Sequence, residues 1–515
     1  MNPAHVMNVF RRVAPLFAAA LLSLSAQVTS PTASITPSPI PNPAGPGAAG
    51  GSLHATPGGT LWLTWTEPTA NGHALRFATR AKGTDAWTPA RTIAEGPGWF
   101  INWADFPALT ADDEGTATAV WFVKNPANPA GVGDHGHGPG YHARISRTND
   151  GGRTWSPPEP LTREGSSVEF VSLATLADGR VLAVWLDGRG KYGAAGRQRL
   201  YARILGTAEP DTLVDPSVCD CCQTALTAFP DGSAVIAYRG RTDAEVRDLR
   251  FARFTGSKWE TPRALADDGW RINACPVNGP QLASQGGQMG AVWFTAADGD
   301  PRVLASFSAD AGGRFVAPLR LNETKPSGRV ATALLRHGSL LATWTDLEGA
   351  IWLRRVSPDF APGEPVRLTP AGSARAKGFP RIALARDYAG GKTAAELVVV
   401  FAADGEPSLR TLQVKIPEGE LLEEERNCEC APPAEELSGF AVRGVTEGPG
   451  SSAGTLRLRL AALPGVVGEG TIEVRAEGEL ATKAREAGRE FLGRIDRTGR
   501  VWRLIAFKPV ATPKR

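Results

Sequence analysis

Six cysteines are the residues with the greatest capacity for chemistry in this chain, and they stand in three short strings. The strings are Cys219-Asp220-Cys221-Cys222, Cys275-Pro276 and Cys428-Glu429-Cys430. One interpretation is disulfide bonds, for example from Cys275 to the first string, although the neighbours Cys221 and Cys222 could pair only with strain. The other is a thiolate metal site formed by Cys219, Cys221, Cys222 and Cys275, because soft sulfur ligands favour copper as Cu(I), or zinc. The sequence indicates no other cofactor.

Distant side chains can meet only if regular elements bring them together, and the chain contains a repeat that would do so. Seven short apolar stretches each end in an aromatic residue, and the intervals between these aromatics are 56, 64, 53, 55, 51 and 57 residues. A near-constant period of this length indicates one structural unit repeated along the chain. The seven aromatics are Trp65, Trp121, Trp185, Tyr238, Trp293, Trp344 and Phe401.

Each repeat has room for four short strands separated by turns, which is the sequence pattern of a β-propeller blade. A single four-stranded sheet cannot bury both faces, whereas sheets packed radially cover one another and leave few exposed edges. The spacing therefore predicts an all-β propeller over residues 52–416, with seven blades favoured and six as the alternative. The last repeat, Phe379 to Ile416, shows only three strands, so we expect the arm before Gly51 to supply a fourth.

Residues just before the innermost strand of each blade are expected at one mouth of the central channel, where a ligand would bind. Arg271, Arg329 and Arg381 hold this place in three consecutive repeats, and Asp105 and Glu169 hold it in two others. The arginines could clamp an anion with the acids as catalytic partners, or they could be rim residues paired with nearby carboxylates. The first two cysteine strings precede the innermost strands of two neighbouring blades, which would bring their sulfurs to the same mouth.

Two turns carry a motif that resembles a known family. They are Ser146–Trp155, centred on Asp150-Gly151-Gly152, and Ser308–Phe315, centred on Asp310-Ala311-Gly312-Gly313. Both resemble the Asp-box, or BNR repeat, of sialidase-like β-propellers, and the resemblance covers residues 52–416. In such a turn the hydroxyl and carboxylate side chains satisfy backbone groups, the glycines adopt positive φ and the aromatic plugs between strands. The resemblance implies the propeller fold, with these turns structural and not catalytic.

Sialidases of this family bind the substrate carboxylate with three arginines and use a tyrosine nucleophile, a glutamate and an aspartate acid or base. The resemblance thus implies a glycan or other small-molecule ligand at the mouth and exo-α-sialidase-like hydrolysis, with the five mouth residues above as candidates. The family's first arginine lies in an Arg-Ile-Pro motif, but Gly51–Ala55 contains no arginine, and the nearest string is Phe379-Pro380-Arg381-Ile382. The alternatives are a non-catalytic propeller that binds a glycan or a protein, and a periplasmic metal-handling protein that uses the cysteines.

A second, smaller domain is expected at the C-terminus. Residues 417–437 are acidic and marked by proline, which predicts a linker, and residues 438–510 show short alternating strands typical of a small OB-like β-barrel. This piece weakly resembles the periplasmic copper-binding barrels of the copper-efflux type, which bind metal through Met, His and Trp. The matching stretch here, Val467–Ile472, contains none of these residues, so we expect that site to be lost.

The N-terminus predicts export. Arg11-Arg12, the apolar run Val13–Leu24 and the small residues that follow give the order of a signal peptide over residues 1–26, and residues 27–51 form a low-complexity linker or arm. No other stretch is long and apolar enough to span a bilayer, so we expect a secreted or periplasmic protein with no membrane span after signal removal. The 56 basic and 53 acidic residues give a net charge of +3, which does not indicate a nucleic-acid partner.

Overall fold

The computed structural model describes residues 35–124, 141–162, 167–189, 197–336, 338–358, 360–372, 378–386, 394–405, 408–417, 440–449, 455–460, 470–476, 490–498 and 501–509. The expected signal peptide and the cysteines at positions 428 and 430 lie outside these residues. Among the described residues, no helix is long and apolar enough to cross a membrane.

The described residues before position 418 form seven four-stranded antiparallel sheets. In six of them the strands follow one another along the chain, so each sheet is a simple meander. The first three are β2 (Ala49–Ala55), β3 (Leu61–Thr69), β4 (Gly72–Arg80), β5 (Arg91–Gly96); β6 (Ala108–Ala111), β7 (Ala117–Lys124), β8 (Tyr141–Thr148), β9 (Glu159–Pro160); and β10 (Val168–Thr175), β11 (Val181–Asp187), β12 (Gln198–Ile204), β13 (Thr212–Val218). The next three are β14 (Ala225–Ala228), β15 (Ala234–Arg239), β16 (Leu249–Phe254), β17 (Arg263–Ala266); β18 (Gln281–Gln285), β19 (Gln288–Thr295), β20 (Arg302–Ser308), β21 (Leu319–Arg320); and β22 (Pro326–Leu334), β23 (Leu340–Asp346), β24 (Ile351–Val356), β25 (Val366–Arg367).

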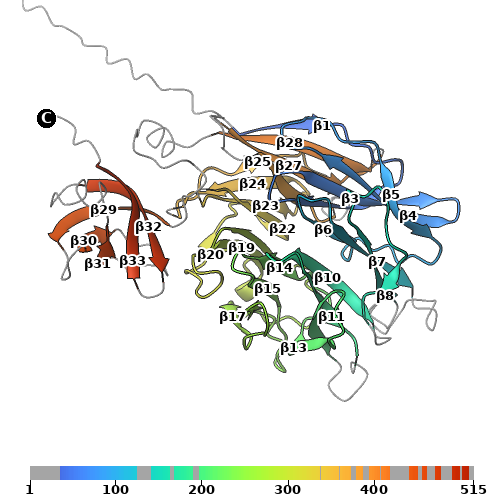
Figure 1. Ribbon diagram of the computed structural model, residues 1–515, viewed down its shortest axis with the longest axis horizontal. Helices are drawn as coiled ribbons and strands as arrows, with labels where there is room; N and C mark the ends of the chain where they lie inside the picture. Colours follow the sequence, from blue (N-terminus) through green and yellow to red (C-terminus); the bar gives the residue numbers. More distant parts are fainter. Residues whose placement is uncertain are drawn as a thin grey trace, which may run out of the picture. The chain divides into compact units, whose positions relative to one another are not determined.

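The seventh sheet joins the two ends of the repeat region. Its strand order is β1 (Thr36–Ile40), β28 (Leu409–Pro417), β27 (Ala394–Ala402) and β26 (Arg381–Arg386). β1 pairs antiparallel with β28 over all five of its residues, and in Figure 1 the blue β1 lies beside the orange β28. The arm before Gly51 therefore supplies the strand that the last repeat lacks, as the sequence predicted.

The first strand of each sheet contacts the first strand of the next sheet, and the series returns to its start. The contacts run from β2 to β6, β10, β14, β18, β22 and β26, and β26 contacts β2. Seven sheets whose innermost strands form a closed ring make a β-propeller, so the predicted all-β propeller is confirmed. Because consecutive meanders keep the same direction, every connection that leads into an innermost strand lies at the same end of the ring.

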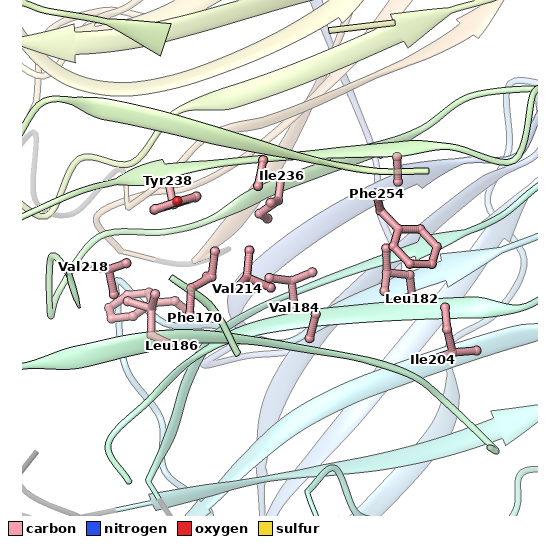
Figure 2. Packing of buried hydrophobic residues seen from close by; sticks show 14 of the residues in the cluster. Phe170, Leu182, Val184, Leu186, Ile204, Val214, Val218, Ile236, Tyr238 and Phe254 are labelled. Carbon is pink, nitrogen blue, oxygen red and sulfur yellow. The ribbon is translucent and has the colours of Figure 1, made fainter. Parts of the chain in front are cut away.

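Apolar side chains between neighbouring sheets hold the ring together. Figure 2 shows the layer between two sheets, where Leu182, Val184 and Leu186 of β11 face Ile236 and Tyr238 of β15. Burying a side chain of this size contributes about 1.5–3 kcal/mol, so the stacked faces are the main source of stability. Five of the aromatics that revealed the repeat are at most 1% exposed, namely Trp65, Trp185, Tyr238, Trp293 and Trp344.

The two Asp-box-like turns are held by their own side chains. In the first, the hydroxyl of Thr148 accepts the N–H of Gly152 at 3.0 Å and donates to Asp150 at 2.7 Å. The same Asp150 oxygen accepts the N–H of Thr154 at 3.0 Å, and hydrogen bonds from Thr154 and Thr148 hold the pKa of Asp150 well below its usual value. The turn within Ser308–Phe315 repeats this arrangement. These hydrogen bonds stabilise both turns.

Gly152 offers a direct test of how such a turn attaches one sheet to the previous one. Its φ is 75°, and a Cβ atom built on it would lie 2.5 Å from the ring of Phe77, which also packs edge-on against Trp155 at 5.7 Å. The neighbouring Gly151 has φ 71° but nothing within 4 Å of such an atom. We expect Gly151→Ala to lower the free energy of unfolding by about 1 kcal/mol, from backbone strain alone. Gly152→Ala should lower it by about 2–4 kcal/mol, because overpacking adds to that strain.

Urea unfolding of the two variants measures this difference. Equal losses in Gly151→Ala and Gly152→Ala would show that the turn does not pack on the neighbouring sheet. The wild type serves as the reference for both variants.

A separate closed barrel follows the propeller in sequence. Its strands run in the order β29 (Phe440–Pro449), β30 (Thr455–Leu460), β31 (Gly470–Arg475), β33 (Val501–Pro509) and β32 (Glu490–Thr498), and β31 pairs with β33 in parallel. Along β30 the side chains alternate, with Leu456 and Leu458 buried and Arg457 and Arg459 exposed. This two-residue period is the one a half-buried strand requires, and it gives the barrel a small apolar interior.

Candidate functional site

The segments that lead into the innermost strands are joined by hydrogen bonds from sheet to sheet. The N–H of Phe170 donates to the carboxylate of Asp105 at 2.9 Å. The amide of Gln223 donates to the carbonyl of Ala104 at 2.7 Å and accepts the N–H of Gly279 at 3.1 Å. These hydrogen bonds therefore join residues from four different sheets at this end of the ring.

The hydrogen bonds between segments of neighbouring sheets continue in the later sheets of the ring. The side chain of Asn278 donates to the carbonyl of Ser327 at 3.2 Å and accepts the N–H of Arg329 at 2.7 Å. Arg329 in turn donates to the carbonyl of Gly378 at 3.2 Å. We call this end of the propeller the mouth, and it consists of residues 99–107, 167–172, 219–225, 275–280, 326–330 and 378–381.

Three aromatic rings and two arginines gather at the mouth, and we call them the aromatic–arginine cluster. Trp103 stacks on Phe379 with 5.7 Å between ring centroids, and Phe106 lies 5.9 Å from the same ring. The guanidinium of Arg329 lies 5.1 Å from the centre of the Trp103 ring, and that of Arg381 lies 4.5 Å from the centre of the Phe106 ring. Trp103 is 38% exposed, so the cluster presents an aromatic face to solvent.

Arg381 is the least compensated charge of this cluster. Burial lowers the pKa of Arg381 to about 10, because a low-dielectric site disfavours the charged form. Its Nη1 atom is buried and has no hydrogen-bond acceptor among the described residues. Arg381 therefore has donor capacity that an anionic ligand could use.

The third predicted arginine lies apart from the other two in its contacts. Arg271 is exposed, and its backbone forms a bridge with Val246 on the connection that follows β15. The described contacts join Arg329 and Arg381 to the aromatic rings of the mouth but give Arg271 none of these partners. Two of the three arginines predicted as a clamp thus share one cluster.

Both predicted acids are at the mouth, and both are buried. Asp105 is 3% exposed and accepts hydrogen bonds from the hydroxyl of Tyr141 at 2.8 Å and from Phe170. Glu169 is fully buried and accepts a hydrogen bond from Ser167 at 2.8 Å. Burial raises the pKa of Asp105 well above its usual value against the opposing effect of its hydrogen bonds. Burial also raises the pKa of Tyr141, and there the negative charge of Asp105 adds to the effect. The two carboxyls face protein donors and not solvent.

The backbone at the mouth is unusually strained for residues other than glycine. Phe170, Val277 and Arg329 have φ angles of 51°, 47° and 56°. Phe170 and Arg329 each lie at an irregularity in the pairing of an innermost strand, where the register shifts. Such conformations cost about 1–3 kcal/mol each and persist only where surrounding contacts enforce them, and they concentrate at functional sites.

Three of the predicted metal-binding cysteines converge on one point of the mouth. Cys219, Cys221 and Cys222 lie on the connection from β13 to β14 and are at most 2% exposed. The sulfur of Cys219 lies 3.9 Å from that of Cys221 and 3.5 Å from that of Cys222, and all three sulfurs lie within 4.8 Å of one another. Cys275, which leads into β18, is exposed, and its thiol is hydrogen-bonded to Cys221. None of these four cysteines forms a disulfide.

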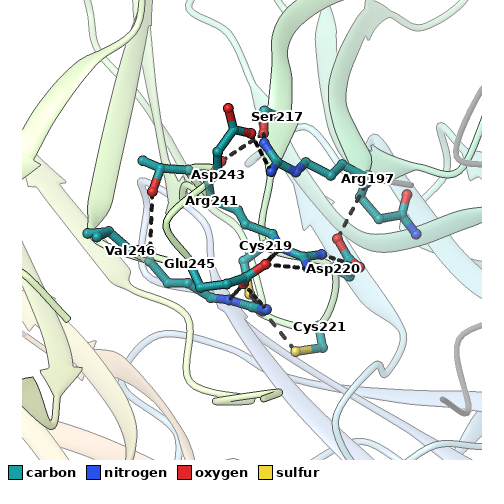
Figure 3. A network of polar contacts seen from close by, with 12 residues as sticks. Arg197, Ser217, Cys219, Asp220, Cys221, Arg241, Asp243, Glu245 and Val246 are labelled. Carbon is teal, nitrogen blue, oxygen red and sulfur yellow. Dashed lines mark hydrogen bonds and ion pairs between the residues drawn. The ribbon is translucent and has the colours of Figure 1, made fainter. Parts of the chain in front are cut away.

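A network of charges surrounds the sulfurs (Figure 3). Arg247 donates to the sulfur of Cys219 at 3.3 Å and to Glu245 at 2.8 Å. Glu245 also accepts from Arg241 at 2.8 Å, and Arg241 reaches Asp220 at 3.1 Å. The turn that carries the cysteines is therefore fixed by ion pairs on the side where Arg247 approaches it.

The charge of the cluster is concentrated on one sulfur. Burial by itself would raise the pKa of Cys219, but hydrogen bonds from Cys221 and Cys222 and the positive charge of Arg247 hold that pKa well below its usual value. Hydrogen bonding with Cys219 raises the pKa of Cys221, and burial raises the pKa of Cys222. These directions favour negative charge on Cys219, the sulfur next to Arg247, over charge on either neighbouring sulfur.

Several residues in the mouth or in contact with it gave no signal in the sequence. Gln223, Asn278 and Arg247 each form hydrogen bonds with residues from another strand or sheet. No local sequence pattern predicts such contacts. Tyr141 lies 36 positions from its partner Asp105. The positive φ of Phe170 could not be predicted from the sequence either, because bulky residues rarely adopt this conformation.

No protein-family model matches the chain, and no curated protein matches it. Among solved structures, it is similar to a protein of unknown function from Dyadobacter fermentans DSM 18053, with 15% identity over 74% of this chain and 98% of that one, at a TM-score of 0.42. It is also similar to the NanB sialidase of Streptococcus pneumoniae, with 10% identity over 74% and 71% of the two chains, at a TM-score of 0.40. An ulvan lyase of polysaccharide lyase family PL25 gives 12% identity, coverage of 75% and 96%, and a TM-score of 0.42. At such identities and TM-scores no activity passes to this chain from these proteins.

Proposed function

We propose that the propeller binds a carboxylated glycan at its mouth through the aromatic–arginine cluster. The observation that supports this most strongly is Arg381, whose buried Nη1 has no acceptor among the described residues. A charged group in low-dielectric surroundings is costly unless an opposite charge compensates it. A ligand carboxylate would provide that charge, and a guanidinium is well suited to it because two parallel N–H groups meet two oxygens.

The rings of the cluster favour a sugar over a small inorganic anion. Trp103 is 38% exposed and is held by stacking on Phe379 at 5.7 Å, so its orientation is fixed. An exposed, pre-oriented aromatic ring offers a flat surface on which the apolar face of a sugar ring can pack. The arginines would then bind the carboxylate beside that surface.

Binding without hydrolysis fits the acids best. The alternative is that the protein also hydrolyses the bound glycan, as sialidases do. Hydrolysis would need Asp105 or Glu169 to reach the glycosidic bond. Asp105 is 3% exposed, Glu169 is fully buried, and both accept hydrogen bonds from neighbouring protein groups. We therefore expect no turnover of a fluorogenic sialoside.

Isothermal calorimetry tests the proposal with sialyllactose and an oligogalacturonate as carboxylated probes and lactose as the neutral one. We expect at least one carboxylated probe to bind tenfold or more tightly than lactose. Arg381→Gln should weaken that binding by roughly 10- to 100-fold, the effect of one charged hydrogen-bonding partner. Arg271→Gln is the matched control, and we expect its affinity to stay within about twofold of the wild type.

Two results would contradict the proposal. One is that neither carboxylated probe binds more tightly than lactose. The other is that Arg381→Gln and Arg271→Gln weaken binding equally, which would place the carboxylate away from the aromatic rings.

The basic, apolar and small order of residues 11–26 supports an exported protein, which would meet such glycans outside the cytoplasm.

A further inference from the structure

The cysteine cluster is a second place at the mouth where chemistry is concentrated, and glycan recognition does not use it. Three sulfurs lie within 4.8 Å of one another at the end of a single turn, and all three side chains are buried. Free cysteines are common in cores as single apolar side chains, but three that direct their sulfurs at one point form a donor set.

We infer that Cys219, Cys221 and Cys222 bind one soft, thiophilic metal ion of the class of Cu(I) or Zn(II). A metal about 2.3 Å from each sulfur sets sulfur–sulfur separations of about 3.8–4.0 Å. The two separations from Cys219, 3.9 Å and 3.5 Å, lie near this value, and the third separation is within 4.8 Å. They are well beyond the length of about 2.05 Å of a disulfide bond.

The surroundings of the cluster suit a negatively charged metal–thiolate complex. Three thiolates with Cu(I) or Zn(II) carry a net charge of −2 or −1, which needs a compensating cation when it is buried. Arg247, whose side chain is 4% exposed, donates to the sulfur of Cys219 and is itself oriented by Glu245. This is the arrangement of an outer partner that orients a ligand and tunes it, and such partners typically change metal affinity by 10–100-fold.

Cys275 gives the buried site a route to solvent. It is exposed, it comes from the neighbouring sheet, and its thiol is hydrogen-bonded to Cys221. Val277, two residues further on, packs against the three buried cysteines and closes the cluster from the same side. An arriving ion can therefore contact the sulfur of Cys275 first. Its sulfur is not among the three that all lie within 4.8 Å of one another, so it would complete a tetrahedral Zn(II) site, which Cu(I) does not require, only after moving towards them.

The test uses the full-length protein, reduced and handled without oxygen, and loaded separately with Cu(I) and with Zn(II) against a competing chelator. We expect one ion per chain in at least one of the two titrations, and an X-ray absorption spectrum with sulfur at about 2.2–2.3 Å. Cys219→Ser, Cys221→Ser and Cys222→Ser should each weaken binding by about 100-fold or more, because each removes a ligand. Cys275→Ser should distinguish the two ions. Binding of three-coordinate Cu(I) should be unchanged, and binding of Zn(II) should weaken by about 10-fold or more as water replaces the fourth sulfur.

Controls keep the outcome decisive. The double variant Cys428→Ser/Cys430→Ser should bind the metal as the wild type does. Circular dichroism identifies any cysteine variant that has failed to fold. Arg247→Gln keeps all the sulfurs and should weaken binding by about 10-fold or more in a folded protein.

The inference is overturned if neither ion binds stoichiometrically, if the absorption spectrum shows no sulfur ligand, or if mass spectrometry of the protein as isolated shows a disulfide between Cys219 and Cys222. Glycan binding by Cys219→Ser is a separate readout, so a failure of the metal site and a failure of the proposed function can be told apart.

Discussion

A chain that begins at Asn42 should be less stable than one that begins at Ile35 by roughly 3–6 kcal/mol. The shorter chain lacks β1, whose five residues pair with β28 from Thr36 opposite Lys415 to Ile40 opposite Thr411. Each lost backbone hydrogen bond costs about 1 kcal/mol, and the exposed edge of β28 adds to that loss. Urea unfolding of the two chains measures the difference, and the shorter chain should also associate more readily through its open edge.

A peptide in trans provides the control for this truncation. A synthetic peptide of residues 34–43 should restore much of the lost stability when it is added to the shorter chain, because it can pair with the open edge of β28. A peptide with the same composition in scrambled order should not. Equal stability of the two chains would mean that the ring is not closed by its N-terminal strand.

Asp105→Ala should destabilise the protein by about 2–5 kcal/mol at neutral pH. The carboxyl is buried and receives the hydroxyl of Tyr141 and the N–H of Phe170, and removing it leaves both donors without an acceptor at a cost of about 1–3 kcal/mol each. Asp105→Asn keeps a side-chain oxygen for Phe170 and is the matched control. We expect it to lose clearly less stability than Asp105→Ala.

The same pair of variants has a signed pH dependence. Burial raises the pKa of Asp105 in the folded protein, so between the unfolded pKa and the raised value the folded state binds more protons than the unfolded state. The contribution of Asp105 is therefore greatest at low pH and falls, by up to about 1.4 kcal/mol per pH unit, as the pH rises towards the folded pKa. Asp105→Asn should remove this slope when unfolding is measured between pH 5 and pH 8. An unchanged slope would show that the carboxyl titrates as an exposed group.

The architecture was accessible from the sequence because its signals are local. Each blade contains an apolar strand that ends in a buried aromatic such as Trp185 or Trp293. The spacing of these aromatic residues gives the length of the repeat. The missing strand of the last repeat was predicted in the same way, since a meander of three strands leaves an edge that another segment must cover. The general location of the site followed from topology, because residues before the innermost strands share one end of the ring.

The chemistry of the mouth was only partly accessible. The convergence of Cys219, Cys221 and Cys222 follows from their proximity in one short string, and the position of Cys275 follows from the neighbouring blade. The burial of Asp105 does not follow, because it depends on the irregular start of β10, where Phe170 turns its N–H towards that carboxylate. Pairings such as these join residues far apart in sequence and leave no pattern in the chain.

Connections from different blades meet at one mouth, where we propose that they bind a carboxylated glycan. Hydrogen–deuterium exchange with and without a saturating carboxylated oligosaccharide tests it most directly, because it reads every segment in one experiment. We predict slower exchange in residues 99–107, 326–330 and 378–382 together, which belong to three different sheets. Protection confined to a single sheet, to the outer strands or to the C-terminal barrel would contradict the account.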